Sequence, residues 1–225
     1  MLILIMTLSV MANEFTVDRP SVGTSGATIG KGMLQVETGA QVAFAGATSV
    51  TAPTLLRLGV SESTEVRLFS DIVTVSDSLQ FGPLGIEGKQ RIYQSDRVIL
   101  GVLANGVIPL QDSVGSVSAL GLLDYSSGRW AYWLNIGGAM ESFESPTWST
   151  LFAIGAGVMV TESIQVCAEQ SGALADSFSG YTQFSVLYTT EDTQWDIYYQ
   201  ASSQDLSEHI VGLGYSQRWS LQRSE

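Results

Sequence analysis

Hydrophobic and polar side chains alternate along most of this chain, and residues 193–202, TQWDIYYQAS, show the pattern clearly. In an extended strand Trp195 and Ile197 fall on one face, while Asp196 and Gln200 fall on the other. The pattern predicts a strand with one apolar face. The medium that this face meets decides the class of protein.

Twelve segments alternate in this way, and no helical periodicity of comparable length competes with them. Most span 9 to 13 residues, close to the roughly 9–11 residues of a tilted membrane-spanning strand and longer than the about 5–6 of an ordinary globular strand. The predicted strands are Met33–Phe44, Thr54–Val60, Thr64–Val73, Leu84–Tyr93, Val98–Leu110, Val114–Tyr125, Trp130–Met140, Leu151–Val160, Ser163–Ser171, Tyr181–Thr189, Gln194–Ser202 and His209–Trp219.

The connections between these strands are of two kinds. Every second one is a tight turn, at 61–64, 94–96, 126–129, 161–162 and 190–193. Most of the others are longer, at 45–53, 74–83, 172–180 and 203–209, with a short link at 111–113 as the exception. Short turns at one end and longer loops at the other are typical of an outer-membrane barrel, whose periplasmic turns are short.

The two faces of the strands differ in chemistry. The apolar face carries Val36, Val42, Phe44, Leu56, Leu58, Val66, Leu68, Leu84, Ile86, Trp130, Tyr132, Leu134, Ile136, Phe152, Ile154, Val158, Phe184, Val186, Tyr188, Val211, Leu213 and Tyr215. The polar face carries Gln35, Glu37, Arg57, Glu65, Arg67, Glu87, Lys89, Arg91, Asn135, Gln165, Glu169, Gln183, Asp196 and Gln200. In a β-sandwich the apolar set would form a dry core; in a membrane barrel it would face lipid and the polar set would line the lumen.

Aromatic residues at strand ends favour the barrel. Tyr125 and Trp130 bracket one tight turn, Tyr188 and Trp195 bracket another, and Trp219 closes the last strand on the same face. Amphipathic rings at these positions are expected of the girdle that lies at a membrane interface. We therefore expect the lipid bilayer to be a partner of the apolar face.

Composition agrees with this interpretation. Hydrophobic residues make up 45% of the 225 residues and charged ones only 14%, against about 25% in a soluble domain, yet the longest strongly apolar stretch is the ten residues 151–160. The net charge of −12 argues against nucleic acid as a partner. Residues 1–12, MLILIMTLSVMA, are expected to be a secretory signal peptide, with a buried first strand as the alternative.

Near the start of the predicted mature chain, residues 15–39, FTVDRPSVGTSGATIGKGMLQVETG, carry a resemblance to a known family. The elements are the triplet 18–20 (Asp-Arg-Pro), a glycine-rich spacer, and Gln35-x-Glu37-x-Gly39; residues 53–68 add a second likeness. The chain here resembles the outer-membrane transporter family of the meta-pathway of phenol degradation. The resemblance implies a secreted barrel, inserted by the barrel-assembly machinery, and passage of small hydrophobic or aromatic compounds.

Charged residues of the polar face gather on one wall, because closure of the barrel sets the last strand beside the first. The lumen-lining candidates are Glu37, Arg57, Glu65, Arg67, Glu87, Lys89, Arg91 and Arg218. They would form either a charged constriction that selects what passes, or a ladder of opposite charges that holds the strand register and fills the lumen.

Catalytic and metal-binding interpretations find little support. The single histidine, His209, has no serine two positions on, as a barrel phospholipase would have, and is expected to be a loop residue. One histidine and one cysteine, far apart in sequence, provide no metal-ligand cluster. We expect no catalytic residue, no metal and no cofactor.

The sequence thus predicts an all-β protein: a closed, antiparallel, up-and-down transmembrane β-barrel of about twelve strands in the bacterial outer membrane, with both ends periplasmic. Residues 31–225 form the barrel, and residues 13–30 form an irregular segment that either hangs in the periplasm or plugs the lumen. The favoured function is passive passage of small-molecule solutes. The alternatives are a structural or surface-interaction barrel with a plugged lumen and a soluble β-sandwich.

Overall fold

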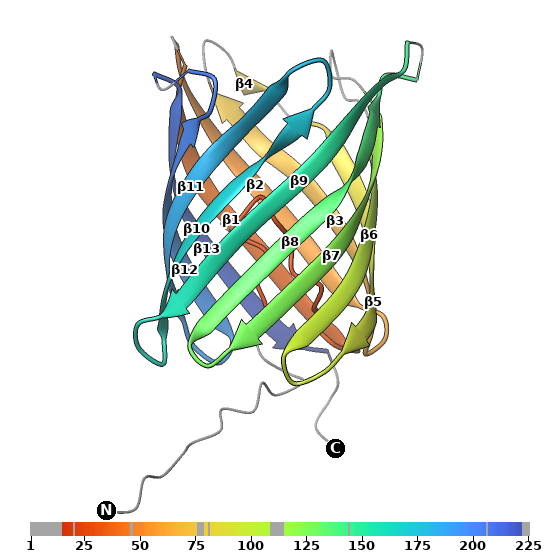
Figure 1. The fold of residues 1–225 in the computed structure, drawn as a ribbon, viewed down its shortest axis with the longest axis vertical. Helices are drawn as coiled ribbons and strands as arrows, with labels where there is room; N and C mark the ends of the chain where they lie inside the picture. Colours follow the sequence, from red (N-terminus) through yellow and green to blue (C-terminus); the bar gives the residue numbers. More distant parts are fainter. Residues whose placement is uncertain are drawn as a thin grey trace, which may run out of the picture.

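The protein is a closed barrel, seen in a computed structural model as a ring of strands tilted relative to the barrel axis (Figure 1). The structure describes residues 15–19, 21–45, 47–75, 79–80, 82–108, 115–143, 145–205 and 207–221. The predicted signal peptide, residues 1–12, lies outside the described residues. No helix among the described residues is long and apolar enough to cross a bilayer.

The strands follow one another around the ring in sequence order. They are β1 (Met33–Ala45), β2 (Ala47–Gly59), β3 (Thr64–Val75), β4 (Leu79–Gln80), β5 (Leu84–Gln94), β6 (Val98–Ile108), β7 (Ser116–Ser127), β8 (Trp130–Glu141), β9 (Thr147–Met159), β10 (Ile164–Leu174), β11 (Phe178–Thr189), β12 (Thr193–Ser202) and β13 (His209–Ser220). The short β4 pairs only with β3, so twelve strands form the ring itself. The predicted fold class, a closed antiparallel up-and-down barrel of about twelve strands, is confirmed.

Closure is made by β1 and β13, which pair in antiparallel register from Met33↔Ser220 to Phe44↔His209. Beyond this ladder, the Leu221 N–H donates to the Gly32 carbonyl (2.8 Å). With no free sheet edge left in the ring, the backbone groups of the strands are satisfied by their neighbours, as a chain in lipid requires.

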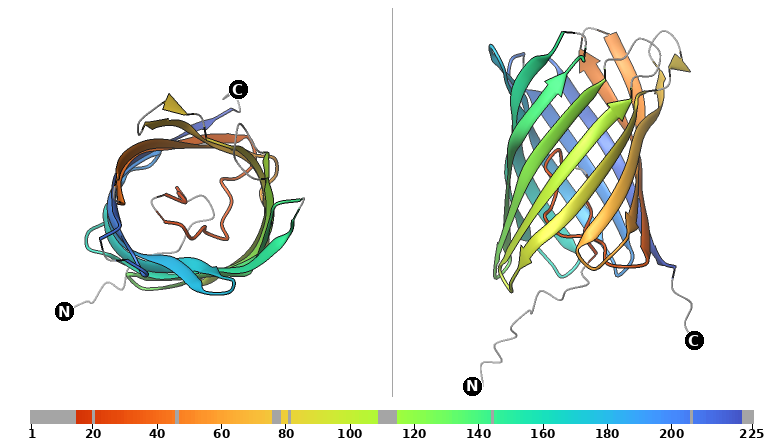
Figure 2. Two further views of the ribbon diagram at one scale, coloured as in Figure 1. Left: turned by 90° about the horizontal axis from the view of Figure 1, so that it is seen from above. Right: turned by 90° about the vertical axis from the view of Figure 1, so that its right-hand side faces the viewer.

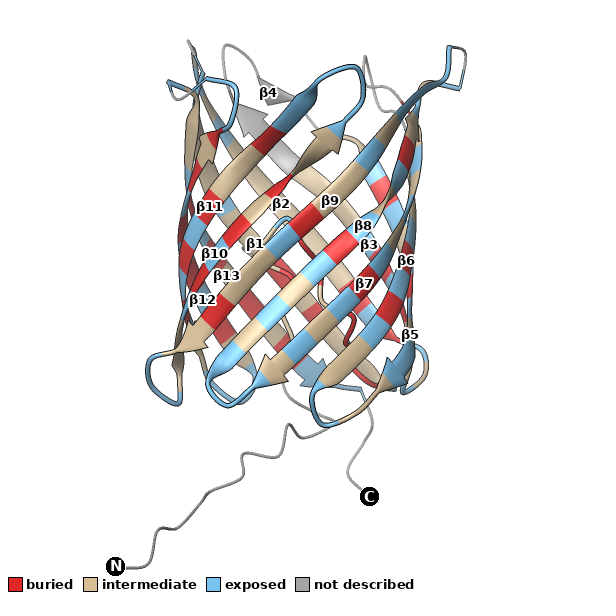
Figure 3. Ribbon diagram, viewed as in Figure 1, coloured by how far each residue is buried: buried red, intermediate tan, exposed pale blue. Residues whose placement is uncertain are grey.

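The alternation of the sequence is reproduced as alternation of burial along the strands (Figure 3). On β12, Trp195 is 49% exposed and Ile197 55%, whereas Asp196 between them is 2% exposed. The apolar residues therefore face outward and the polar residues face the lumen. This is the inverse of a soluble fold, and it excludes the sandwich, in which the apolar set would be covered by a second sheet.

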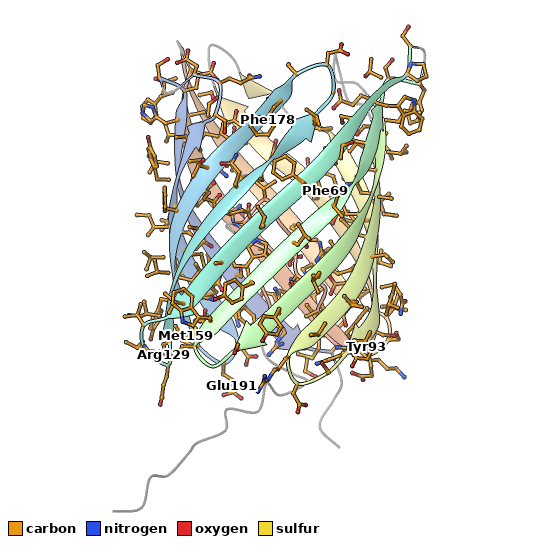
Figure 4. All side chains as sticks on the ribbon, viewed as in Figure 1. Phe69, Tyr93, Arg129, Met159, Phe178 and Glu191 are labelled. Carbon is orange, nitrogen blue, oxygen red and sulfur yellow. The ribbon has the colours of Figure 1, made fainter. Side chains whose placement is uncertain are left out.

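The two ends of the barrel differ. One end, here called the turn end, holds the short connections 60–63, 95–97, 128–129, 160–163 and 190–192, together with the start of β1 and the end of β13. The opposite end is the loop end. Figure 4 shows Arg129, Met159 and Glu191 at the turn end, where the Arg129 Nε donates to the Met159 carbonyl (2.6 Å) of the neighbouring turn.

Two of the predicted long loops are wrong. Residues 45–53 are almost entirely strand, because β1 and β2 pair as far as Ala45↔Ala47, and residues 172–180 are strand except for 175–177. Their alternating small, hydroxyl and β-branched side chains can continue a ladder past the apolar zone, so the strands extend further than the hydrophobic pattern does.

Candidate functional site: the filled lumen

The described residues of the range 15–30, namely 15–19 and 21–30, lie inside the barrel rather than along its outside, as the view from above shows (Figure 2). We call this segment the lumen segment. It is irregular because it carries glycines at 23, 26 and 30, and it connects to β1 through Gly30 and Gly32, whose φ angles of 84° and 70° favour glycine. At Gly23 an added Cβ would lie 2.7 Å from Glu169 Oε2 and 2.9 Å from Trp133 Cδ1, so any larger residue would force these side chains or the segment to shift.

One set of contacts joins the lumen segment to a cluster of charges on β1, β2, β3 and β5. Arg57 pairs with Glu37 (2.7 Å) and Glu65 (3.0 Å), and Arg67 pairs with Glu65 (2.6 Å) and Glu87 (3.1 Å). These side chains are buried or nearly so, and the wall cluster of Arg57, Arg67, Lys89, Glu37, Glu65 and Glu87 contains equal numbers of cations and carboxylates.

Asp18 of the lumen segment enters this cluster as a further carboxylate. It pairs with Arg67, with Lys89 (3.2 Å) and, more distantly, with Arg57 (3.8 Å). Burial by itself would raise the pKa of the Asp18 carboxyl, but the charges of Arg67, Lys89 and Arg57 outweigh it and hold the pKa well below the ordinary 3.8. Asp18 is therefore ionised at neutral pH and fixes the start of the lumen segment.

Wall groups from other strands bind the rest of the segment. Glu169 on β10 accepts hydrogen bonds from the Val22 N–H (2.9 Å), the Ser21 hydroxyl (2.6 Å) and the Trp133 indole N–H (2.6 Å). Asn135 on β8 pairs with both main-chain groups of Thr24, accepting from its N–H (2.6 Å) and donating to its carbonyl (2.9 Å).

The later residues are held from β7, β3 and β5. Asp124 accepts from the Gly26 N–H (2.8 Å), and Glu65 accepts from the Ile29 N–H (2.9 Å). Lys89 donates to the carbonyls of Ser25 (2.8 Å) and Ala27 (2.9 Å). Contacts from strands around the ring therefore fix the segment across the lumen.

A cavity of about 640 cubic ångströms lies next to the lumen segment, within the half of the barrel toward the loop end. Val22 and Thr24 of the segment form part of its lining, so the segment bounds the cavity on one side. The side chains that line its wall include the apolar Leu55, Phe69, Leu103, Leu120 and Ala153. An interior with so much apolar surface differs from the polar lumen of a water-filled porin.

The structure brings six of the eight lumen-lining candidates together, namely Glu37, Arg57, Glu65, Arg67, Glu87 and Lys89. The other two lie at the turn end. Arg91 is next to a register irregularity in β5 and donates to the Glu62 carbonyl (2.7 Å), and Arg218 lies over the Phe15 ring (5.1 Å) and 3.7 Å from Asp192.

Five wall residues that hydrogen-bond the lumen segment were not among the site candidates: Gln35, Asp124, Asn135, Glu169 and Gln194. Trp133, which donates to Glu169, was not among them either. Asn135 and Glu169 had been placed on the polar face, and Trp133 has the same parity as Asn135. An indole at a lumen-facing position was a usable signal, since such a ring needs a partner for its N–H. What it binds could not be read from sequence.

His209 lies on the outside of the barrel near the loop end. Its ring stacks on Phe44 (4.8 Å between centroids), and its Nδ1 lies 3.2 Å from the Ser207 carbonyl. No group of three or more His, Cys, Asp and Glu side chains in the described part of the chain is arranged to hold a metal ion.

No family model and no curated protein matches the chain. Among solved structures it is similar to a KdgM porin in complex with disordered oligogalacturonate (5% identity, 81% of this chain and 98% of that one, TM-score 0.65). It is also similar to an outer-membrane channel from Pseudomonas putida F1 (12% identity, 86% and 97%, TM-score 0.60) and to a NanC porin (12% identity, 82% and 98%, TM-score 0.62). At these identities the likeness shows the fold: this chain has the barrel fold of outer-membrane porins and channels.

Proposed function

We propose that this protein is an outer-membrane channel for small molecules, closed at rest by its own lumen segment. The observation that carries the proposal is that Asp18, Arg19 and residues 21–24 of the lumen segment line the cavity inside the barrel together with the wall. A closure made of a segment attached to the wall mainly by hydrogen bonds and ion pairs can be displaced while every strand pairing stays intact.

The proposed orientation sets the turn end, with both chain ends, in the periplasm and the loop end outside the cell. The outward apolar residues then contact acyl chains. Tyr125, Trp130, Tyr188, Trp195 and Trp219, all outward and exposed, would lie at the periplasmic interface.

The proposed solutes are small aromatic or hydrophobic compounds, entering from the loop end. The apolar side chains of Leu55, Phe69 and Leu103 in the cavity lining support this class, because they would interact favourably with an apolar solute. The resemblance of residues 15–39 to the transporter family of the meta-pathway of phenol degradation points the same way. Membership of that family stays a prediction, since no family model matches.

The rival function, a structural or surface-interaction barrel with a permanently filled lumen, is favoured by a different observation. Ion pairs and hydrogen bonds from β1, β2, β3, β5, β7, β8, β10 and β12 all reach the lumen segment. A segment so widely attached would stay in place unless a specific event released it.

Single-channel conductance in planar bilayers separates the two functions. Gly23→Val would force the segment away from Glu169 and Trp133, whereas Gly88→Val is the matched control, because a Cβ at Gly88 meets no heavy atom within 4 Å. A channel closed by its segment gives a higher conductance with Gly23→Val and an unchanged one with Gly88→Val. If Gly23→Val and a variant lacking residues 13–30 both insert but conduct no more than the natural chain, the passage of solutes is excluded.

A further inference from the structure

The lumen wall recognises the main chain of the lumen segment more than its side chains. Wall carboxylate and amide oxygens accept from main-chain N–H groups at six positions: Asp18, Arg19, Val22, Gly23, Thr24 and Gly26, with Ile29 as a seventh further along. Wall donors reach main-chain carbonyls at Thr16, Arg19, Thr24, Ser25 and Ala27.

Main-chain recognition of this kind is how proteins bind extended peptides with tolerance of sequence, because every residue offers the same N–H and carbonyl. Here the wall supplies the partners from side chains, since the backbone of each strand is already paired around the ring. The acceptors Glu37, Glu169, Asp124 and Glu65 are carboxyl groups, and a hydrogen bond from an N–H group to an ionised carboxylate is stronger than one between neutral groups.

Side chains of the segment also contact the wall. Asp18 is surrounded by three cations, and a Cβ at Gly23 would force Glu169 and Trp133 to shift. Four hydroxyl side chains make hydrogen bonds: Ser21 to Glu169, Thr24 to Arg67, Ser25 to Asp124 and Thr28 to the Glu62 carbonyl. The Val22 side chain, in contrast, is 60% exposed, on the side of the segment that lines the cavity.

We propose that the lumen of this barrel is a peptide-binding site, and that residues 15–30 are the ligand it holds in the resting protein. The ligand class is a peptide that folds back on itself, as the Ser25 N–H does onto Asp18 (3.0 Å), with an aspartate and, five residues later, a glycine. A separate peptide of this class takes the place of the lumen segment once that segment is released. This property goes beyond the passage of small molecules and does not depend on it.

The covalent connection of the segment allows the test. The segment joins β1 only through residues 30–32, and Lys31 there is exposed. A specific protease site inserted beside Lys31 lets the full chain fold in detergent before the connection is cut. The cut barrel then keeps its strands, while the segment is free to exchange with a fluorescently labelled peptide of residues 15–30 added in excess.

Binding is measured by fluorescence anisotropy, and release of the original segment by mass spectrometry. We expect saturable exchange. N-methylation of the peptide at Gly23, which removes an N–H that Glu169 accepts, weakens binding by at least about tenfold. N-methylation at Val17, whose N–H has no wall partner among the described residues, is the control and changes binding by less than about threefold. A peptide with Asp18→Asn binds at least about tenfold more weakly.

Two results would overturn the inference. One is failure of the labelled peptide to exchange into the cut barrel. The other is equal binding of the Gly23-methylated and Val17-methylated peptides. Equal binding would mean that hydrogen bonds to the peptide main chain do not determine affinity. Conductance of the same cut preparation is recorded separately: saturable binding without any conductance supports the peptide site while counting against the proposed channel.

Discussion

Arg19 of the lumen segment and Asp196 of β12 lie over the two glycines of one cross-strand pair, Gly39 and Gly214. A Cβ at Gly39 would be 2.5 Å from Arg19 Nη2, and a Cβ at Gly214 would be 2.3 Å from Asp196 Oδ2. The lack of side chains at these two glycines leaves room for both charged groups next to the same part of the wall. Yet no hydrogen bond from the described residues reaches either Asp196 oxygen or Arg19 Nε and Nη2.

No hydrogen-bond donor among the described residues reaches the buried Asp196 carboxylate. We therefore expect the free-energy cost of burying its charge to exceed the favourable electrostatic attraction to Arg19. We therefore expect Asp196→Asn to raise the free energy of unfolding by about 1–2 kcal/mol, since the amide removes that charge. The measurement is urea unfolding in detergent, with the exposed loop variant Asp176→Asn as control. A loss of stability would instead show that the attraction between Arg19 and Asp196 dominates.

The wall cluster gives a second prediction. Arg57→Gln leaves Glu37 and Glu65 without a shared, fully buried cation, and breaking a buried pair in this way costs about 3–5 kcal/mol. The loss should appear as a lower unfolding midpoint in the same urea titration. Arg97→Gln, in an exposed turn at the turn end, should have no comparable effect. Equal midpoints for the two variants would contradict the structural importance of the cluster.

The third prediction concerns pH. Since the pKa of Asp18 is lower in the folded protein than its ordinary 3.8, its ionisation stabilises the bound lumen segment at every pH above that value, and the contribution is lost as the pH falls below it toward the folded pKa. Conductance should therefore stay constant between about pH 7 and 5 and rise only in stronger acid. In Asp18→Asn this acid step should be smaller, since only the remaining carboxyl groups that hold the segment are left to be protonated. An opening midpoint near pH 6 would assign the release to another group.

Contact with lipid is tested by quenching of tryptophan fluorescence with brominated phospholipids, in variants that keep one tryptophan each. Trp130, Trp195 and Trp219 are exposed on the outer face and should be quenched. Trp133 is the internal control, because its indole N–H is bonded to Glu169 inside the barrel. Quenching of Trp133 as strong as that of Trp195 would mean that the proposed lipid face is wrong.

Much of the fold could be predicted because inward and outward positions alternate along each strand of a barrel. The alternation of polar and apolar residues in the sequence therefore indicates which side chains face the lumen. The lumen position of Asp196 and the outer position of Trp195 follow from that period alone. The ends of the strands at the loop end were wrong, because residues such as Thr48 and Val50 pair outside the apolar zone, where hydrophobicity no longer marks a strand.

The site was predictable only in part. That Arg57, Arg67 and Lys89 share a wall follows from strand order, since neighbouring strands bring inward residues together. The contact of Asp18 with Arg67 could not be foreseen, because it depends on how an irregular segment 49 residues earlier crosses the lumen. Likewise the position of Arg91 is set by a register shift between Arg91 and Tyr93 that the alternation does not reveal.

The contacts that fix the lumen segment also cross-brace the cylinder. Asn135 on β8 and Glu37 on β1, on opposite sides of the ring, are joined through Thr24 and Arg19, so opposing walls are tied together by the same bonds that hold the segment in the lumen. Withdrawing the segment would remove these contacts across the lumen. The shape of the barrel would then depend only on the pairing between neighbouring strands. Any agent that displaces the segment should therefore also lower the stability of the barrel. A drop in melting temperature would report this displacement without any conductance measurement.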